Sequence, residues 1–197
     1  MNILTEKLPE HINVSGTPVK IHTDFRLYIK AMGLLGAGNR SQLAEVLDML
    51  IAEPEKVNKA NINECITALM EFIEHSKVKT EGTGKSATKC FDFEYDAERI
   101  YAAFLQQYNI DLSVCDMHWW MFKALFDGLS EETQLVKVMQ YRAMDLTKIK
   151  DKEQKEFYRK KKEYYKIPLP EHIAKERNEI AEILANGGNI SEFLRSE

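Results

Sequence analysis

Residues 116–129, DMHWWMFKALFDGL, contain the only two tryptophans of the 197-residue chain and form one of its most apolar segments. If residues 114–129 are wound as a helix, Asp116, Lys123 and Asp127 share one narrow polar stripe, and nearly all other positions are apolar. A helix this apolar must be surrounded, either by its own fold or by a partner. The sequence therefore predicts that it is the central helix of a bundle.

The two tryptophans lie at the margins of the polar stripe, Trp119 on one side and Trp120 on the other. A tryptophan at such a margin either covers the edge of a core or anchors another protein, because its large ring buries much apolar surface. Both interpretations stay open at this point. We take Trp119 and Trp120 as candidate partner-binding residues, with a role as a cover over the core as the alternative.

His118 falls on the side of this helix opposite the polar stripe, among apolar residues. A catalytic histidine would need a carboxylate or a nucleophile converging on it, and no motif spacing supplies one. We therefore expect a buried, hydrogen-bonded, structural histidine. No other pattern indicates a catalytic, metal-binding or cofactor-binding residue, so the chain is not expected to be an enzyme.

The rest of the N-terminal half indicates a mostly α fold. Two short β-prone runs around Ser15 and Gly16 predict a hairpin. Amphipathic patterns then predict helices over residues 25–36, 42–53, 62–75, 97–110 and 131–144. The predicted fold class is a helical bundle with a small N-terminal β-hairpin and a helical C-terminal arm. Residues 1–145 form the predicted globular domain.

Residues 76–90 interrupt the helical periodicity and are predicted to be a flexible polar loop. They contain Gly84, Lys85 and Ser86, which resemble the end of a phosphate-binding loop. That motif requires a glycine five positions before Gly84, where this chain has Lys79, and a helix after the serine. A nucleotide site is therefore not predicted.

Residues 146–197 are predicted to be a basic and aromatic C-terminal arm. Between residues 148 and 166 there are nine basic and four acidic side chains, although the whole chain carries a net charge of −4. Aromatic residues share one side of this segment, and they are further candidates for partner binding: Phe157, Tyr158, Tyr164 and Tyr165. The stripe suits docking on the body of the protein or on another subunit of a homo-oligomer. Nucleic acid is the weaker alternative, because the remaining surface is acidic.

A last amphipathic pattern covers residues 171–184 and ends at the sequence NGG. Its narrow apolar stripe consists of Ile173, Ile180, Ile183 and Leu184. A helix with such a stripe needs a surface to lie on, so this segment is a candidate for a partner-bound element.

Composition and the N-terminal sequence predict the cellular compartment of the protein. No run of about 18 apolar residues exists, so no membrane span is expected. The N-terminus lacks the basic and then apolar pattern of a signal peptide, which predicts a cytoplasmic protein. Cys65, Cys90 and Cys115 are widely spaced and fit neither a zinc site nor a disulfide framework, so they are expected to be free thiols.

Several stretches together resemble a known family. They are DFEYDAERIYAAFLQQYNIDL, HWWMFKALFDGL and VMQYRAMDL, with LPEHINV and IHTDFRLYIK near the N-terminus. The most distinctive residues are His118, Trp119, Trp120, Phe122, Gly128, Leu129, Tyr141 and Arg142. This set is similar to the family named after the fifteenth gene product of certain long-tailed bacteriophages, and the similarity covers most of the chain.

The resemblance implies a place in the tail-morphogenesis gene cluster, between the tail-tube and tape-measure genes. Proteins encoded there typically act as non-enzymatic tail assembly chaperones, which cover the tape-measure helices and recruit tube subunits in the cytoplasm of the host bacterium. Tape-measure and tail-tube proteins are thus the expected partners, and no cofactor is expected. A structural tail component that stays in the virion is the alternative, and a nucleic-acid-binding protein or an enzyme is a weaker one.

Overall fold

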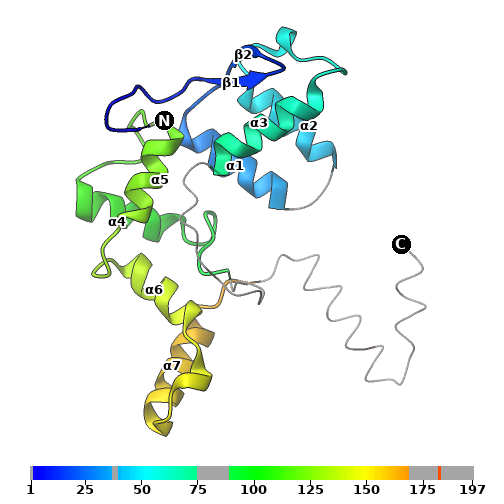
Figure 1. The fold of residues 1–197 in the computed structure, drawn as a ribbon. Helices are drawn as coiled ribbons and strands as arrows, with labels where there is room; N and C mark the ends of the chain where they lie inside the picture. The colour runs from blue at the N-terminus through cyan, green and yellow to red at the C-terminus, as the bar shows by residue number, and fades with distance from the viewer. Residues whose placement is uncertain (1, 37–39, 75–88, 169–181, 183–197) are drawn as a thin grey trace.

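The computed structural model describes residues 2–36, 40–74, 89–168 and 182 (Figure 1). Within them the protein is mostly helical, with an N-terminal two-stranded hairpin, as predicted. The elements are β1 (His11–Val14), β2 (Thr17–Lys20), α1 (Phe25–Gly36), α2 (Arg40–Leu50), η1 (Pro54–Lys56), α3 (Ile62–Glu74), α4 (Ala97–Tyr108), α5 (Trp119–Asp127), α6 (Gln134–Ala143), η2 (Leu146–Lys148) and α7 (Lys152–Tyr164). The hairpin lies beside α1–α3, and α6 and α7 extend away from α4 and α5 (Figure 1).

The predicted hairpin is confirmed, and its turn explains its sequence. Ser15 and Gly16 have positive φ angles of 51° and 80°, the conformation of a tight two-residue hairpin turn. The antiparallel register pairs Ile12 with Val19 and buries both side chains. The hairpin thus supplies one apolar face, which packs against α3.

Helix α2 ends at Leu50, three residues before the predicted end. The following residues pair with the extension of β2 instead of continuing the helix. The N–H of His22 donates to the carbonyl of Leu50 (2.9 Å), and the N–H of Ala52 donates to the carbonyl of Lys20 (3.0 Å). These non-local bonds take the place of the last helical turn.

The prediction for the N-terminal end of the double-tryptophan helix was wrong. The helix was expected from residue 114, but α5 begins at Trp119, and Val114 is exposed in a turn. Residues just before α5 pair with the segment before α1. The N–H of Phe25 donates to the carbonyl of Met117 (3.1 Å), and the N–H of Trp119 donates to the carbonyl of Thr23 (2.8 Å). This short bridge holds the starts of α1 and α5 together.

The core extends from the hairpin to α6, and its part between α1, α4 and α5 is built from stacked aromatic rings. Phe122 is fully buried and stacks with Phe25 at 4.8 Å and with Phe104 at 5.1 Å between ring centroids. Trp119 stacks with Tyr28 at 5.3 Å. Burial raises the pKa of the Tyr28 hydroxyl, which donates to the carbonyl of His22 (2.7 Å). The expected central position of the apolar part of α5 is therefore confirmed.

The start of the predicted arm folds back on the body. Tyr141 of α6 stacks with Tyr165, just after α7, with the ring centroids 5.8 Å apart. The ammonium of Lys162 donates to the carbonyl of Met144 (2.9 Å). Docking on the protein's own body was one of the two predicted arrangements of the arm. The predicted helix over 171–184, except Glu182, and most of the predicted loop over 76–90 lie outside the described residues.

Candidate functional site

The two tryptophans and a neighbouring lysine cap the C-terminal end of α3. The indole N–H groups of Trp119 and Trp120 donate to the carbonyls of Ile73 (3.1 Å) and Phe72 (2.9 Å), respectively. The ammonium of Lys123 donates to the same Ile73 carbonyl (3.1 Å). The last carbonyls of a helix have no partner within it, and a positive charge is favourable there. The double-tryptophan motif therefore supplies the missing donors to another helix.

Both tryptophans are buried, with 2% of Trp119 and 8% of Trp120 exposed. This arrangement favours the interpretation that they cover the core. An indole with so little exposed surface can contact a partner only at its edge unless α5 moves. Their role as partner anchors stays a prediction.

His118 caps the start of α5 instead of lying within the helix. Its Nδ1 accepts from the backbone N–H of Trp120 (3.0 Å), and its Nε2 lies 3.0 Å from the carbonyl oxygen of Pro9. A neutral imidazole with its proton on Nε2 satisfies both contacts. His118 therefore joins the N-terminal segment to α5, which is a structural role.

We expect His118→Ala to lower the free energy of unfolding by about 1–3 kcal/mol, because a helix cap and the contact with Pro9 are both lost. Urea denaturation measures this change. His118→Asn is the matched control, since asparagine is a good cap but is too short to replace both contacts, so its loss should be smaller. Equal stability of wild type and His118→Ala would contradict the assigned role.

A buried ion pair joins α4 to α6. The guanidinium of Arg142 donates to both carboxylate oxygens of Asp96, at 2.6 and 3.0 Å, and both residues are buried. The same guanidinium donates to the carbonyl of Cys90 (3.0 Å) and, through Nε, to the carbonyl of Tyr165 (2.5 Å). We call these four residues the Arg142 junction. It ties α4, α6, the end of α7 and the segment before α4 together.

An apolar cavity of about 330 Å³ opens beside α5, next to the tryptophan caps. We call it the aromatic pocket. It is lined by five aromatic side chains, two aliphatic ones and three charged ones: Phe91, Phe93, Trp119, Phe122, Phe126, Met32, Ile73, Glu74, Lys123 and Asp127. The lining comes from α1, α3, α5 and the segment before α4, so distant parts of the chain build it. The sequence prediction included only Trp119 of this set.

Two of the three charged residues of the aromatic pocket, Lys123 and Asp127, are partly desolvated. Burial lowers the pKa of Lys123, and the carboxylates of Asp127 and Glu74 oppose that shift. Burial also raises the pKa of Asp127, and the ammonium of Lys123 opposes it. An apolar cavity with charges of both signs suits an apolar side chain presented by an amphipathic segment.

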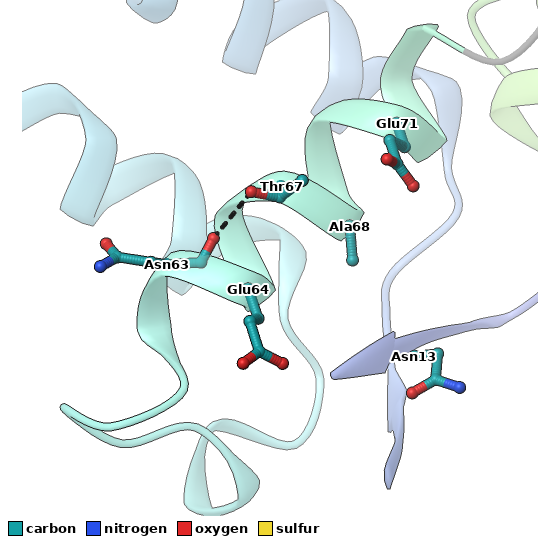
Figure 2. Close-up of a pocket in the computed structure, with 6 residues that line it drawn as sticks. All are labelled: Asn13, Asn63, Glu64, Thr67, Ala68 and Glu71. Carbon is teal, nitrogen blue, oxygen red and sulfur yellow. Dashed lines mark hydrogen bonds between the residues drawn. The ribbon is translucent and has the colours of Figure 1, made fainter. Parts of the chain in front are cut away.

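A second hollow, of about 320 Å³, lies between α3 and β1 (Figure 2). The side chains of Glu64, Ala68 and Glu71 lie along α3 on the side that faces Asn13 (Figure 2). Two of its polar side chains are hydrogen-bonded: Glu64 accepts from the hydroxyl of Ser15 (2.6 Å), and the hydroxyl of Thr67 donates to the carbonyl of Asn63 (3.0 Å). Across the described ranges no group of three or more side chains could hold a metal ion.

The four aromatic candidates of the arm divide into two pairs. Tyr158 and Tyr165 are half-buried and contact Tyr141. Phe157 and Tyr164 are exposed. All four aromatic residues lie in α7 or directly after it, and none of them lines the aromatic pocket. The structure therefore does not bring the six predicted partner-binding residues into one site.

The fold and the pocket define a small, mostly helical protein with an apolar cavity at its surface. Residues 4–167 match the family model described as Bacteriophage Gp15 protein, and the chain belongs to this family. The match confirms the resemblance and includes α7. Comparisons with curated proteins and with solved structures found no match. Over the described ranges, no helix is long and apolar enough to cross a membrane.

Proposed function

We propose that this phage protein is a non-enzymatic tail assembly chaperone that binds tape-measure and tail-tube proteins in the cytoplasm of the host cell. Membership of a bacteriophage family supports a role in phage development. The resemblance of the chain to proteins of the tail gene cluster supports the assignment to tail assembly. In this proposal the aromatic pocket receives an apolar side chain from a helical segment of the tape-measure protein.

The aromatic pocket is the observation that carries the proposal. Phe91 and Phe126 line it and contact each other with ring centroids 4.9 Å apart, yet both remain partly exposed. Exposed apolar surface of this kind is typical of a binding site, because its burial by a partner is favourable. The flanking Lys123 and Asp127 can pair with the charged face of an amphipathic helix.

Paired substitutions test the pocket. Met32 lines it and is 37% exposed, whereas Met121 is 44% exposed on α5 and lies outside its lining. We expect Met32→Glu to reduce the amount of co-expressed tape-measure protein that stays soluble by about tenfold, since a carboxylate is costly to bury in an apolar contact. Met121→Glu should leave the amount of soluble tape-measure protein unchanged. Equal retention by both variants would contradict a role for the pocket in binding.

The alternative role, a structural tail component, predicts a different location. Mass spectrometry of purified virions should then find the protein in a fixed ratio to the tail-tube protein. A chaperone should be present in infected cells and absent from particles. Stoichiometric presence in the virion would contradict the chaperone proposal.

A further inference from the structure

One edge of the aromatic pocket carries two carboxylates and one ammonium. Glu74 and Asp127 line the pocket with exposed side chains, and we call these two residues the acidic edge. Lys123 is half-buried beside them. Its ammonium donates to the carbonyl of Ile73 and lies 5.8 Å from the centroid of the Trp119 ring. The pocket therefore presents mainly carboxylates to a partner that approaches it.

The acidic edge coincides with the C-terminal ends of two helices. α3 ends at Glu74 and α5 ends at Asp127. The C-terminal end of a helix carries a partial negative charge, and neither helix has a basic side chain in its last turn. Lys123 offsets part of this charge, but one ammonium cannot balance two carboxylates and two helix ends. The charge at this edge of the pocket is therefore negative.

Asp127 lies where its own charge is unfavourable. The apolar walls around this exposed carboxylate desolvate it enough to raise its pKa, and the ammonium of Lys123 only partly opposes the shift. A cation from a partner would relieve this imbalance, whereas a further carboxylate would add to it. The partly exposed rings of Phe91 and Phe126 also favour a cation, because the face of an aromatic ring attracts positive charge.

We propose that the segment received by the aromatic pocket carries a lysine or an arginine one helical turn from its apolar anchor, and that this cation binds at the acidic edge. Residues three or four positions apart lie on the same side of a helix, so one segment can place both groups. The aliphatic stem of the basic side chain can also cover the apolar rim. The tape-measure protein as occupant rests on the proposed function, whereas the charge preference of the pocket does not.

Two small ligands of similar size and opposite charge test this preference without any partner. 4-Phenylbutylamine and 4-phenylbutyrate are small enough that we expect dissociation constants of about 1 mM, which nuclear magnetic resonance titration measures. The chain has two indole N–H signals, and Trp119 lines the pocket whereas Trp120 does not. The amine should shift the Trp119 signal with a Kd about fivefold lower than that of the carboxylate. Equal or tighter binding of the carboxylate, or no shift with either ligand, would overturn the proposal.

A pair of variants locates the source of the preference. Asp127→Asn should weaken binding of 4-phenylbutylamine by about threefold, because it removes a charge and keeps the shape of the side chain. Glu131→Gln is the matched control, since Glu131 is exposed and does not line the pocket. It should leave the Kd unchanged. An undiminished affinity of Asp127→Asn for the amine would overturn the acidic edge as the binding site of the cation.

Purified tape-measure protein then tests the occupant. Asp127→Lys in the full chain should weaken its binding by about tenfold, because like charges would meet, and Glu131→Lys should not. Equal binding by wild type and Asp127→Lys would overturn the proposed contact and leave the chaperone function standing. If wild type does not bind but the preference for the amine holds, the chaperone function is contradicted instead. Self-association that Asp127→Lys abolishes, measured by light scattering, would identify a second copy as the occupant and overturn the assignment to the tape-measure protein.

Discussion

Arg142→Leu should lower the free energy of unfolding by about 3–5 kcal/mol, the usual cost of leaving one member of a buried ion pair uncompensated. Asp96 is buried, and two of the bonds to its carboxylate come from Arg142. The substitution also removes the donors to the carbonyls of Cys90 and Tyr165. Many domains are stable by only about 5–15 kcal/mol, so much of the stability should be lost. Thermal and urea denaturation measure the change.

Arg99→Leu is the matched control for the buried pair. Arg99 donates to the same carboxylate of Asp96 (2.9 Å), but its side chain is 31% exposed, so solvent weakens this ion pair relative to the buried one. We expect a loss of about 1 kcal/mol or less. Arg142→Lys should lower the free energy of unfolding by an amount between those of Arg99→Leu and Arg142→Leu, because one ammonium cannot reproduce the forked contact of the guanidinium. Equal losses for Arg99→Leu and Arg142→Leu would show that burial of the pair is not the determining factor.

Local sequence patterns predicted the parts of the fold that local forces determine. The hairpin was predicted because Ser15 and Gly16 adopt a turn between β-prone runs, and α1 was predicted over its full length from its apolar spacing. The start of α5 could not be predicted in this way. It depends on Phe25 and Thr23 pairing with residues more than 90 positions away. The apolar pattern before Trp119 is equally compatible with a helix or an extended segment.

The site was less predictable because its contacts are non-local. The helical projection placed both tryptophans at a polar margin, but their N–H groups are satisfied by α3, which is remote in the sequence. For the aromatic pocket, the sequence contained one pattern that could have indicated it. Phe91 and Phe93 alternate with the charged residues Asp92 and Glu94, a spacing that would place both aromatic side chains on one face of an extended segment. Nothing in the sequence indicated that this face would meet Phe126 of α5.

The residues that carry the family resemblance mainly hold the fold together. His118 caps α5, the tryptophans cap α3, and Arg142 forms the junction. Gly128 is in close contact as well, since a Cβ there would lie 3.1 Å from the hydroxyl of Tyr108. The family resemblance therefore rests largely on residues that make structural contacts, whereas the pocket is a surface that those contacts position.

Trp119→Ala should lower the free energy of unfolding by about 3–5 kcal/mol, because it removes a large buried side chain and leaves a cavity. The lost indole stacks with Tyr28 and with Phe122, at centroid distances of 5.3 and 5.8 Å. The donor to the carbonyl of Ile73 is lost with it. Equilibrium denaturation in urea, monitored by circular dichroism, measures the loss without relying on the fluorescence of the removed residue.

Trp119→Phe separates packing from capping. It keeps an aromatic ring near Tyr28 but removes the N–H donor to Ile73, so we expect a loss of about 1–3 kcal/mol. Trp120→Phe makes the same chemical change at the bond to Phe72 and should have a similar effect. If Trp119→Ala instead changes stability by less than about 1 kcal/mol, the indole does not hold the core together. Reduced tape-measure binding by that stable variant would then favour the interpretation of Trp119 as a partner anchor, because its only remaining role would lie at the aromatic pocket.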